Sequence, residues 1–127
     1  MINGLFDQSN YVAAKKMLDA TVLRHEAIAS NLANLETPNY KRVDVAPSFQ
    51  TELRNALETK NPGQISSLQP QIATDPNALP NGADGNSVQL ENELMQMNKN
   101  FVEHSLETQL VTGNLLKLRL AITGRAA

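Results

Sequence analysis

Two histidines and their neighbouring glutamates are the residues of this 127-residue chain whose types could do acid–base or metal chemistry. His25 stands beside Glu26, and Glu107 follows His104 by three residues, which places that pair on one face of a helix. A metal site needs three or four convergent ligands, and the sequence shows no such cluster and contains no cysteine. Each histidine replaces an apolar residue in a helical pattern, so a role in fixing the register of packed helices is the stronger interpretation.

The other charged residues do not form a recognisable catalytic or nucleic-acid site. Glu91, Glu93, Glu103 and Glu107 are spread along one helical segment, and no phosphate-binding loop, nucleophile elbow or HExxH motif is present. The formal charge is -2, and the basic pairs are isolated. We therefore expect no catalytic residue, no cofactor, no metal and no nucleic-acid partner. No apolar run reaches the length of a transmembrane helix, and the first twenty residues do not resemble a cleaved secretory signal.

The elements that position these residues are expected to be helices. The chain has no tryptophan and 4% aromatic residues, so its core must come mainly from aliphatic side chains, as in helices packed on helices. All six prolines lie between Pro38 and Pro80, and this divides the chain into an N-terminal helix region (1–36), a middle segment (37–86) and a C-terminal helix (87–127). Periodicity predicts helices over 9–35 and 87–122, the second ending at Gly124.

The middle segment is predicted to be largely irregular. Residues 59–86 contain four prolines, three glycines and four asparagines, with few large apolar side chains. This composition favours a flexible loop without a core of its own. The expected fold is therefore all-α: two long helices packed as a coiled-coil-like hairpin and joined by a loop rich in proline, glycine and asparagine.

Apolar residues exceed what such a hairpin can cover. Both predicted helices carry one stripe at 3–4 spacing, from Tyr11 to Leu35 and from Leu90 to Ile122, and further apolar residues beside it. Because two packed helices bury one stripe each, the remaining surface needs another chain. We therefore expect a homo-oligomer whose candidate assembly residues are Leu18, Ile28, Leu32, Leu94, Met97, Phe101, Leu106, Leu110, Leu115 and Leu118.

One local motif is specific. Residues 30–42, SNLANLETPNYKR, describe a helix end followed by a tight turn at Pro38 and Asn39. This segment resembles the bacterial flagellar axial proteins, the rod, hook and hook-associated family, except that Asn39 stands where that family usually has glycine. The resemblance continues in DGNSVQLENELMQM (84–97) and LLKLRLAITG (115–124). The positions that carry over in the first motif are Asn31, Leu32, Ala33, Asn34, Thr37, Pro38 and Tyr40.

The short middle segment is typical of the small proximal-rod subunits of this family. The resemblance implies a subunit of a helical tube, the flagellar drive shaft, which crosses the periplasm and is exported unfolded by the flagellar type III system. It implies contacts with other rod subunits, with the basal ring and with export-gate or adaptor proteins. Two alternatives remain open: another proximal-rod paralogue, and a soluble helical export chaperone or adaptor.

Overall fold

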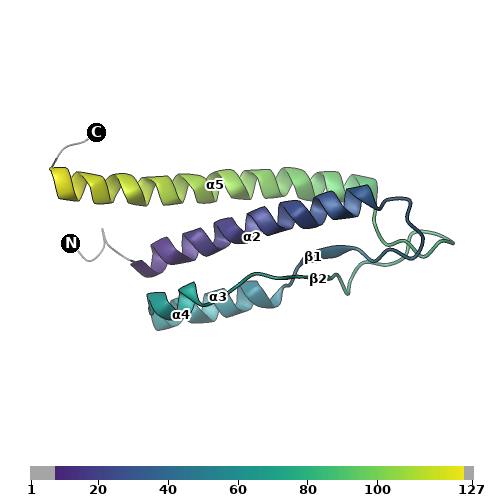
Figure 1. Ribbon diagram of the computed structural model, residues 1–127, viewed down its shortest axis with the longest axis horizontal. Coiled ribbons are helices and arrows are strands. Elements are labelled where there is room, and N and C mark those ends of the chain that lie inside the picture. Colours follow the sequence, from purple (N-terminus) through teal and green to yellow (C-terminus); the bar gives the residue numbers. More distant parts are fainter. Residues whose placement is uncertain (1–7, 125–127) are drawn as a thin grey trace.

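Helices arranged in layers make up most of the computed structural model, which describes residues 8–124. In Figure 1 the long C-terminal helix lies along one side, the N-terminal helix lies in the middle, and two short helices with a small sheet lie on the other side. In chain order the elements are α2 (Gln8–Ala33), β1 (Val43–Val45), α3 (Ser48–Thr59), α4 (Pro62–Ser66), β2 (Ile72–Thr74) and α5 (Leu90–Thr123). The two long helices predicted from the sequence are therefore present, close to their expected bounds.

The prediction that residues 59–86 form a flexible loop without a core is wrong for the first part of that range. Pro62 opens helix α4, where its missing N–H costs nothing, and the Asn61 side chain accepts hydrogen bonds from the next backbone amides. Strand β2 then pairs antiparallel with β1, with Val43 opposite Thr74. Residues 75–86 are irregular, but several of their backbone amides are hydrogen-bonded. Proline composition alone did not reveal these short elements.

The hydrophobic core lies between α2 and the layer formed by the middle segment. On α2 the small residues Ala13 and Ala20, seven positions apart, let α3 and α4 approach the helix closely. Opposite them, Phe49 and Leu53 of α3 and the fully buried Ile65 of α4 fill the core. The chain thus buries a small core of its own, to which the middle segment contributes most of the large side chains.

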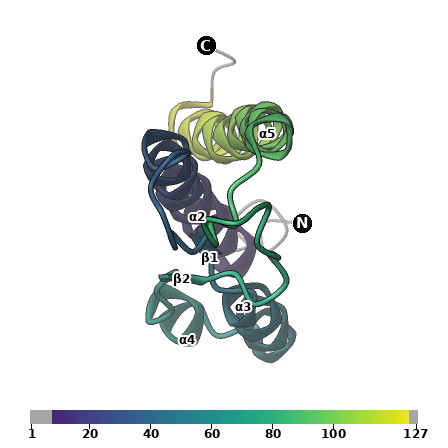
Figure 2. The ribbon, with the colours of Figure 1, turned by 90° about the vertical axis from the view of Figure 1, so that its right-hand side faces the viewer.

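Helix α5 packs on the other side of α2, as the end view in Figure 2 shows, and it does so through polar residues. Glu93 and Asn100 are its buried residues. Most large members of the predicted seam of α5 do not pack within the chain and remain exposed: Leu90, Leu94, Phe101, Leu115, Leu118 and Ile122. Met97, His104 and Val111 of the same seam are half-buried. The polar face turns inward because α2 and Arg42, the residue before β1, offer it hydrogen-bond partners. In residues 8–124, no helix is long and apolar enough to span a membrane.

Candidate functional site

The C-terminal end of α2 is held by Asn31, which is completely buried. Its Nδ2 donates to the carbonyl oxygen of Val43 at 2.8 Å and to Oε2 of Glu93 at 3.2 Å, while its Oδ1 accepts from the Val43 amide at 2.9 Å. The carboxamide thus pairs with both backbone groups of one β1 residue, as a neighbouring strand would. One side chain therefore joins α2 to β1 and to α5.

The turn after α2 is built by other motif residues. The Tyr40 hydroxyl lies 3.4 Å from Oδ1 of Asn31, and the Thr37 hydroxyl donates to Oδ1 of Asn34 at 3.1 Å. Asn39 adopts a left-handed φ of 61°, the conformation for which glycine is the usual residue, and asparagine tolerates it best among the others. Of the remaining motif positions, Leu32 is half-buried, whereas Ala33 and Pro38 are exposed.

The two motifs that the sequence placed far apart meet at this end of the molecule. The Asn86 side chain donates to the carbonyl oxygens of Asn34, Leu35 and Thr37 at 2.8, 3.1 and 2.8 Å, and its Oδ1 accepts from the Val88 amide. Because α2 ends at Ala33, these carbonyls belong to the turn that follows the helix, and the Asn86 side chain holds that turn. The C-terminal helix was predicted to start at residue 87, but it starts at Leu90, and the Asn86 side chain bonds to the turn after α2.

Replacing Asn86 with alanine should destabilise the fold by about 1–3 kcal/mol, because three carbonyl groups of the turn after α2 lose the side-chain donor that they share. Asn55→Ala, on the exposed side of α3, is the matched control and should change stability by less than about 0.5 kcal/mol. Urea denaturation followed by circular dichroism measures both. Equal midpoints for the two variants would contradict the bridging role.

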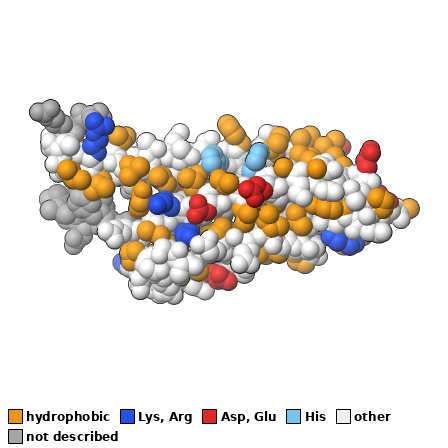
Figure 3. All heavy atoms as spheres, in the orientation of Figure 1, with side chains coloured by type: hydrophobic (Ala, Val, Ile, Leu, Met, Phe, Trp, Pro, Cys, Tyr) orange, Lys and Arg blue, Asp and Glu red, His pale blue; other side chains and the backbone are white. Residues whose placement is uncertain are grey.

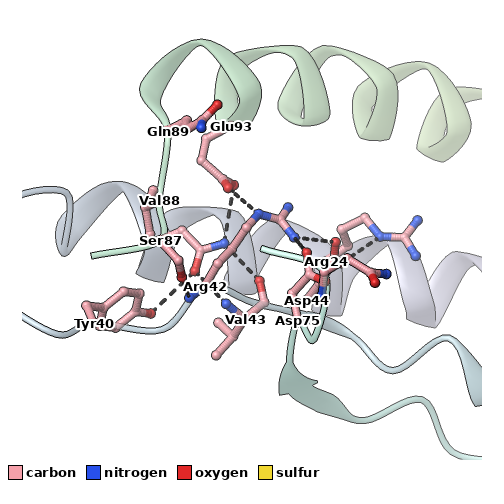
Figure 4. A network of polar contacts seen from close by, with 12 residues as sticks. Arg24, Tyr40, Arg42, Val43, Asp44, Asp75, Ser87, Val88, Gln89 and Glu93 are labelled. Carbon is pink, nitrogen blue, oxygen red and sulfur yellow. Dashed lines mark hydrogen bonds and ion pairs between the residues drawn. The ribbon is translucent and has the colours of Figure 1, made fainter. Parts of the chain in front are cut away.

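A buried ion-pair network lies beside Asn31 (Figure 4). Arg42, whose side chain is 5% exposed, pairs through Nε with the fully buried Glu93 and through Nη1 with Asp44 at 3.1 Å and Asp75 at 2.9 Å. Arg24 extends the network from Asp44 to Glu103 of α5, at 3.2 Å in each case. The network therefore connects α2, the β1 segment, the residue after β2 and α5.

The electrostatics of Arg42 favour its charged form. Burial acts to lower the pKa of Arg42. Glu93 and Asp44 accept hydrogen bonds from its guanidinium and attract its positive charge, and together these effects outweigh burial and raise the pKa above the ordinary arginine value. The Arg42 backbone amide also donates to Oγ of Ser87 at 2.8 Å, which ties the motif to the segment before α5. This arrangement holds three segments together and leaves no exposed group for acid–base chemistry at Arg42.

The two histidines line an apolar groove of about 470 Å³ between α2 and α5, together with Val22, Met97 and Phe101. Figure 3 shows histidine side chains among hydrophobic ones on this face. Nδ1 of His104 lies 2.9 Å from Oγ1 of Thr21, whose hydroxyl donates to the carbonyl oxygen of Leu18, so Nδ1 of His104 is the donor. His104 thus links the two helices, while among residues 8–124 no three histidine or acidic side chains gather as a metal site would require.

A second, more polar groove of about 390 Å³ runs on another side of the same helix pair, and Glu103 and Glu107 of α5 line it. Oε2 of Glu107 is shielded from solvent and has no hydrogen-bond partner. Burial and, second, the charge of Glu103 raise the pKa of Glu107. The groove lining therefore includes a carboxylate oxygen that no donor within residues 8–124 satisfies.

Replacing Glu107 with glutamine should stabilise the isolated chain at pH 7. A raised pKa in the folded state means that folding penalises the charged carboxylate, so the penalty is present above the folded pKa and disappears below the unfolded value of about 4.3. The variant and the parent should therefore converge in stability as the pH falls below about 4. Urea midpoints at several pH values measure this, and a gain in stability that persists below pH 4 would contradict it.

No protein-family model matches the chain. A curated protein, the flagellar basal body rod protein FlgB of Aquifex aeolicus, is 32% identical to it over 117 residues, which cover 88% of this chain and 91% of that protein. The chain belongs to the FlgB family. FlgB of Borrelia hermsii is 26% identical over 127 residues, 86% of this chain and 92% of that protein, and FlgB of Aeromonas hydrophila is 24% identical over 111 residues, 80% of this chain and 83% of that protein. The resemblance to the flagellar axial proteins is thereby confirmed.

This FlgB-family chain exposes most of the residues that the sequence predicted as assembly contacts. Phe101 is 71% exposed and Leu106 55%, and the exposed set is completed by Leu94, Leu110, Leu115 and Leu118. Leu18, Leu32 and Met97 are half-buried, and Ile28 is buried within the chain. Ile28 therefore lacks the exposure that a contact between copies requires.

Sequence reasoning missed Arg42, Glu93 and Asn86 as the residues that hold this FlgB-family fold together. All three stand inside the quoted motifs, but their partners are distant in the sequence, with 51 positions between Arg42 and Glu93. The sequence did offer one indication. Arg42 and Asp44 stand two positions apart where β1 begins, and side chains at that spacing in an extended segment point to the same face, so the two opposite charges could pair.

Proposed function

We propose that the chain is a structural subunit of the proximal rod of the bacterial flagellar basal body and is required for motility. Its relatives are named as basal body rod proteins, and the family assignment carries this proposal. The function is mechanical: the subunit transmits torque through packed helices as part of the drive shaft, and no catalytic step is involved. It acts in the periplasmic part of the basal body after export by the flagellar type III system.

The assembly that we propose is a helical tube in which the two long helices of each subunit form the tube wall. The observation behind it is a row of exposed apolar side chains on α5, four residues apart, formed by Val102, Leu106 and Leu110. A monomer seldom exposes an apolar face of this length. Copies of this chain and other rod subunits would cover that face, while the basal ring and the export gate would contact the tube at its base.

Within each subunit we propose a division of roles among the three segments. Regions 1–36 and 87–127 supply the helices of the tube, and region 37–86 braces α2 from the side through the core around Phe49 and Ile65. Such a brace would keep α2 straight while α5 contacts neighbours.

A double substitution on the exposed leucines tests the proposal. L106E/L110E should abolish rod assembly and motility in cells that depend on this chain, because two charges would be buried in each subunit contact. The control T51E/N55E places two glutamates at the same spacing on the exposed side of α3 and should leave motility near the parent level. Swimming assays and electron microscopy of isolated basal bodies give the readout. Motility equal to the parent in the leucine variant would contradict the proposal.

A further inference from the structure

Charge is distributed unevenly along α5. Its acidic residues, Glu91, Glu93, Glu103 and Glu107, all precede position 108, and residues 108–123 contain two cations and no acid. These cations, Lys117 and Arg119, are exposed and form no ion pair within residues 8–124. The last turns of α5 are therefore a leucine-rich helix end with unpaired positive charge.

The polar groove is lined by three acidic residues, Asp44, Glu103 and Glu107, and by two basic ones, Arg24 and Lys99, so acidic side chains outnumber basic ones there. Glu107 contributes a carboxylate oxygen that has no hydrogen-bond partner, whereas Glu103 is already paired with Arg24. The aliphatic and aromatic parts of Met17, Leu53 and Phe49 line the groove beside these carboxylates. A long side chain with an apolar stem and a cationic head matches such a lining, because the stem packs on apolar surface while the head meets the carboxylate.

On this basis, and resting on the proposed rod function, we propose that the Glu107 groove receives a cation from the basic end of a neighbouring subunit's C-terminal helix. That helix has the chemistry of this chain's own residues 108–123 and lies parallel to α5, shifted along it. The neighbour's Lys117 or Arg119 reaches Glu103 or Glu107 of this chain when the neighbouring helix is shifted by 10 to 16 residues. This shift is about 15–24 Å along the helix axis. The exposed leucines supply the apolar contact, and the ion pair sets its register.

The parallel direction follows from the need for continued growth. An antiparallel pair centred near Thr112 would also place Lys117 beside Glu107, but it would satisfy both copies at once and close the assembly as a dimer. A parallel, shifted contact leaves one free groove and one free basic end on every pair, so further subunits can add.

Cross-linking of full-length chains tests the contact, since the protein contains no cysteine that would interfere. A mixture of the single variants Glu107→Cys and Lys117→Cys should form disulfide-linked dimers under mild oxidation, whereas each variant alone should not. Thr112→Cys alone is the control for direction: efficient homodimers from it would indicate the antiparallel pair and overturn the parallel arrangement. Absence of mixed dimers would overturn the contact itself.

Charge reversal tests the energetic role. Glu107→Lys should weaken self-association about tenfold or more, since two like charges would meet, and mixing it with the variant K117E/R119E should restore association. The milder Glu107→Gln should weaken association while the isolated chain stays folded, which separates docking from stability. If Glu107→Lys assembles as well as the parent while L106E/L110E does not, the groove inference fails and the rod function stands. Failure of both variants to alter assembly would contradict both proposals.

Discussion

Replacing Arg42 with methionine is expected to reduce the free energy of unfolding by about 3–5 kcal/mol, the range for removing one partner of a buried ion pair. The substitution keeps most of the side-chain volume but removes the cation from Glu93, which is completely buried. A buried carboxylate that has lost its partner cannot recover hydration, and Asn31 is the remaining donor beside it. Urea denaturation of the purified chain, followed by circular dichroism, measures the loss.

Two further variants test whether the loss comes from the unpaired Glu93 carboxylate. The double variant R42M/E93M removes both charges and should recover much of the loss, because an apolar pair of similar volume often replaces a buried ion pair at little cost. Arg54→Met, at an exposed position of α3, should change stability by less than about 0.5 kcal/mol. If R42M unfolds at the parent's urea concentration, Arg42 does not hold these segments together.

Replacing Ile65 with alanine is expected to cost about 2–5 kcal/mol, the range for a fully buried aliphatic side chain whose cavity cannot collapse. Ile65 is 0% exposed and belongs to the same core as Phe49 and Ala20. The loss would come from a segment that, by composition, favours a loop. Urea midpoints of the parent and the variant measure it.

The matched control is Leu79→Ala, since Leu79 lies in the same proline-rich stretch but is 76% exposed. It should leave stability within about 0.5 kcal/mol of the parent. Equal effects of the two substitutions would show that burial of Ile65 against α2 does not contribute to stability. A large effect of Ile65→Ala with none of Leu79→Ala would instead establish the middle segment as part of the folded subunit.

The contrast between the two sides of α2 bears on the mechanical role. One side packs on an aliphatic core, whereas the other meets α5 through polar contacts such as Asn100 Nδ2 to the Thr21 carbonyl oxygen at 2.9 Å. Polar contacts are directional, so they specify one register of α5 on α2, and the apolar face of α5 stays free for neighbours. In the proposed assembly, that exposed face of α5 would contact neighbouring subunits.

Much of the fold could be predicted from local pattern. Apolar periodicity located α2 and α5, and proline positions located the connection, because both signals act within a few residues. The motif around Asn31 and Pro38 and the segment from Asp84 led to the flagellar axial proteins. The excess of leucine over what two helices can bury predicts an assembly surface; Leu106 and Leu110 are exposed, and the surface itself stays a prediction.

What the tertiary structure alone decided is which faces meet. A stripe of apolar residues does not indicate which surface it packs against. The sequence pattern predicted that the leucines of α5 pack on α2, but Glu93 and Asn100 lie there instead. Short elements such as α4 and β2 are too brief for periodicity to reveal and form because α2 and β1 cover them. A polar residue becomes interior only when a distant partner compensates its lost hydration, and that compensation exists between Arg42 and Glu93 once the chain has folded.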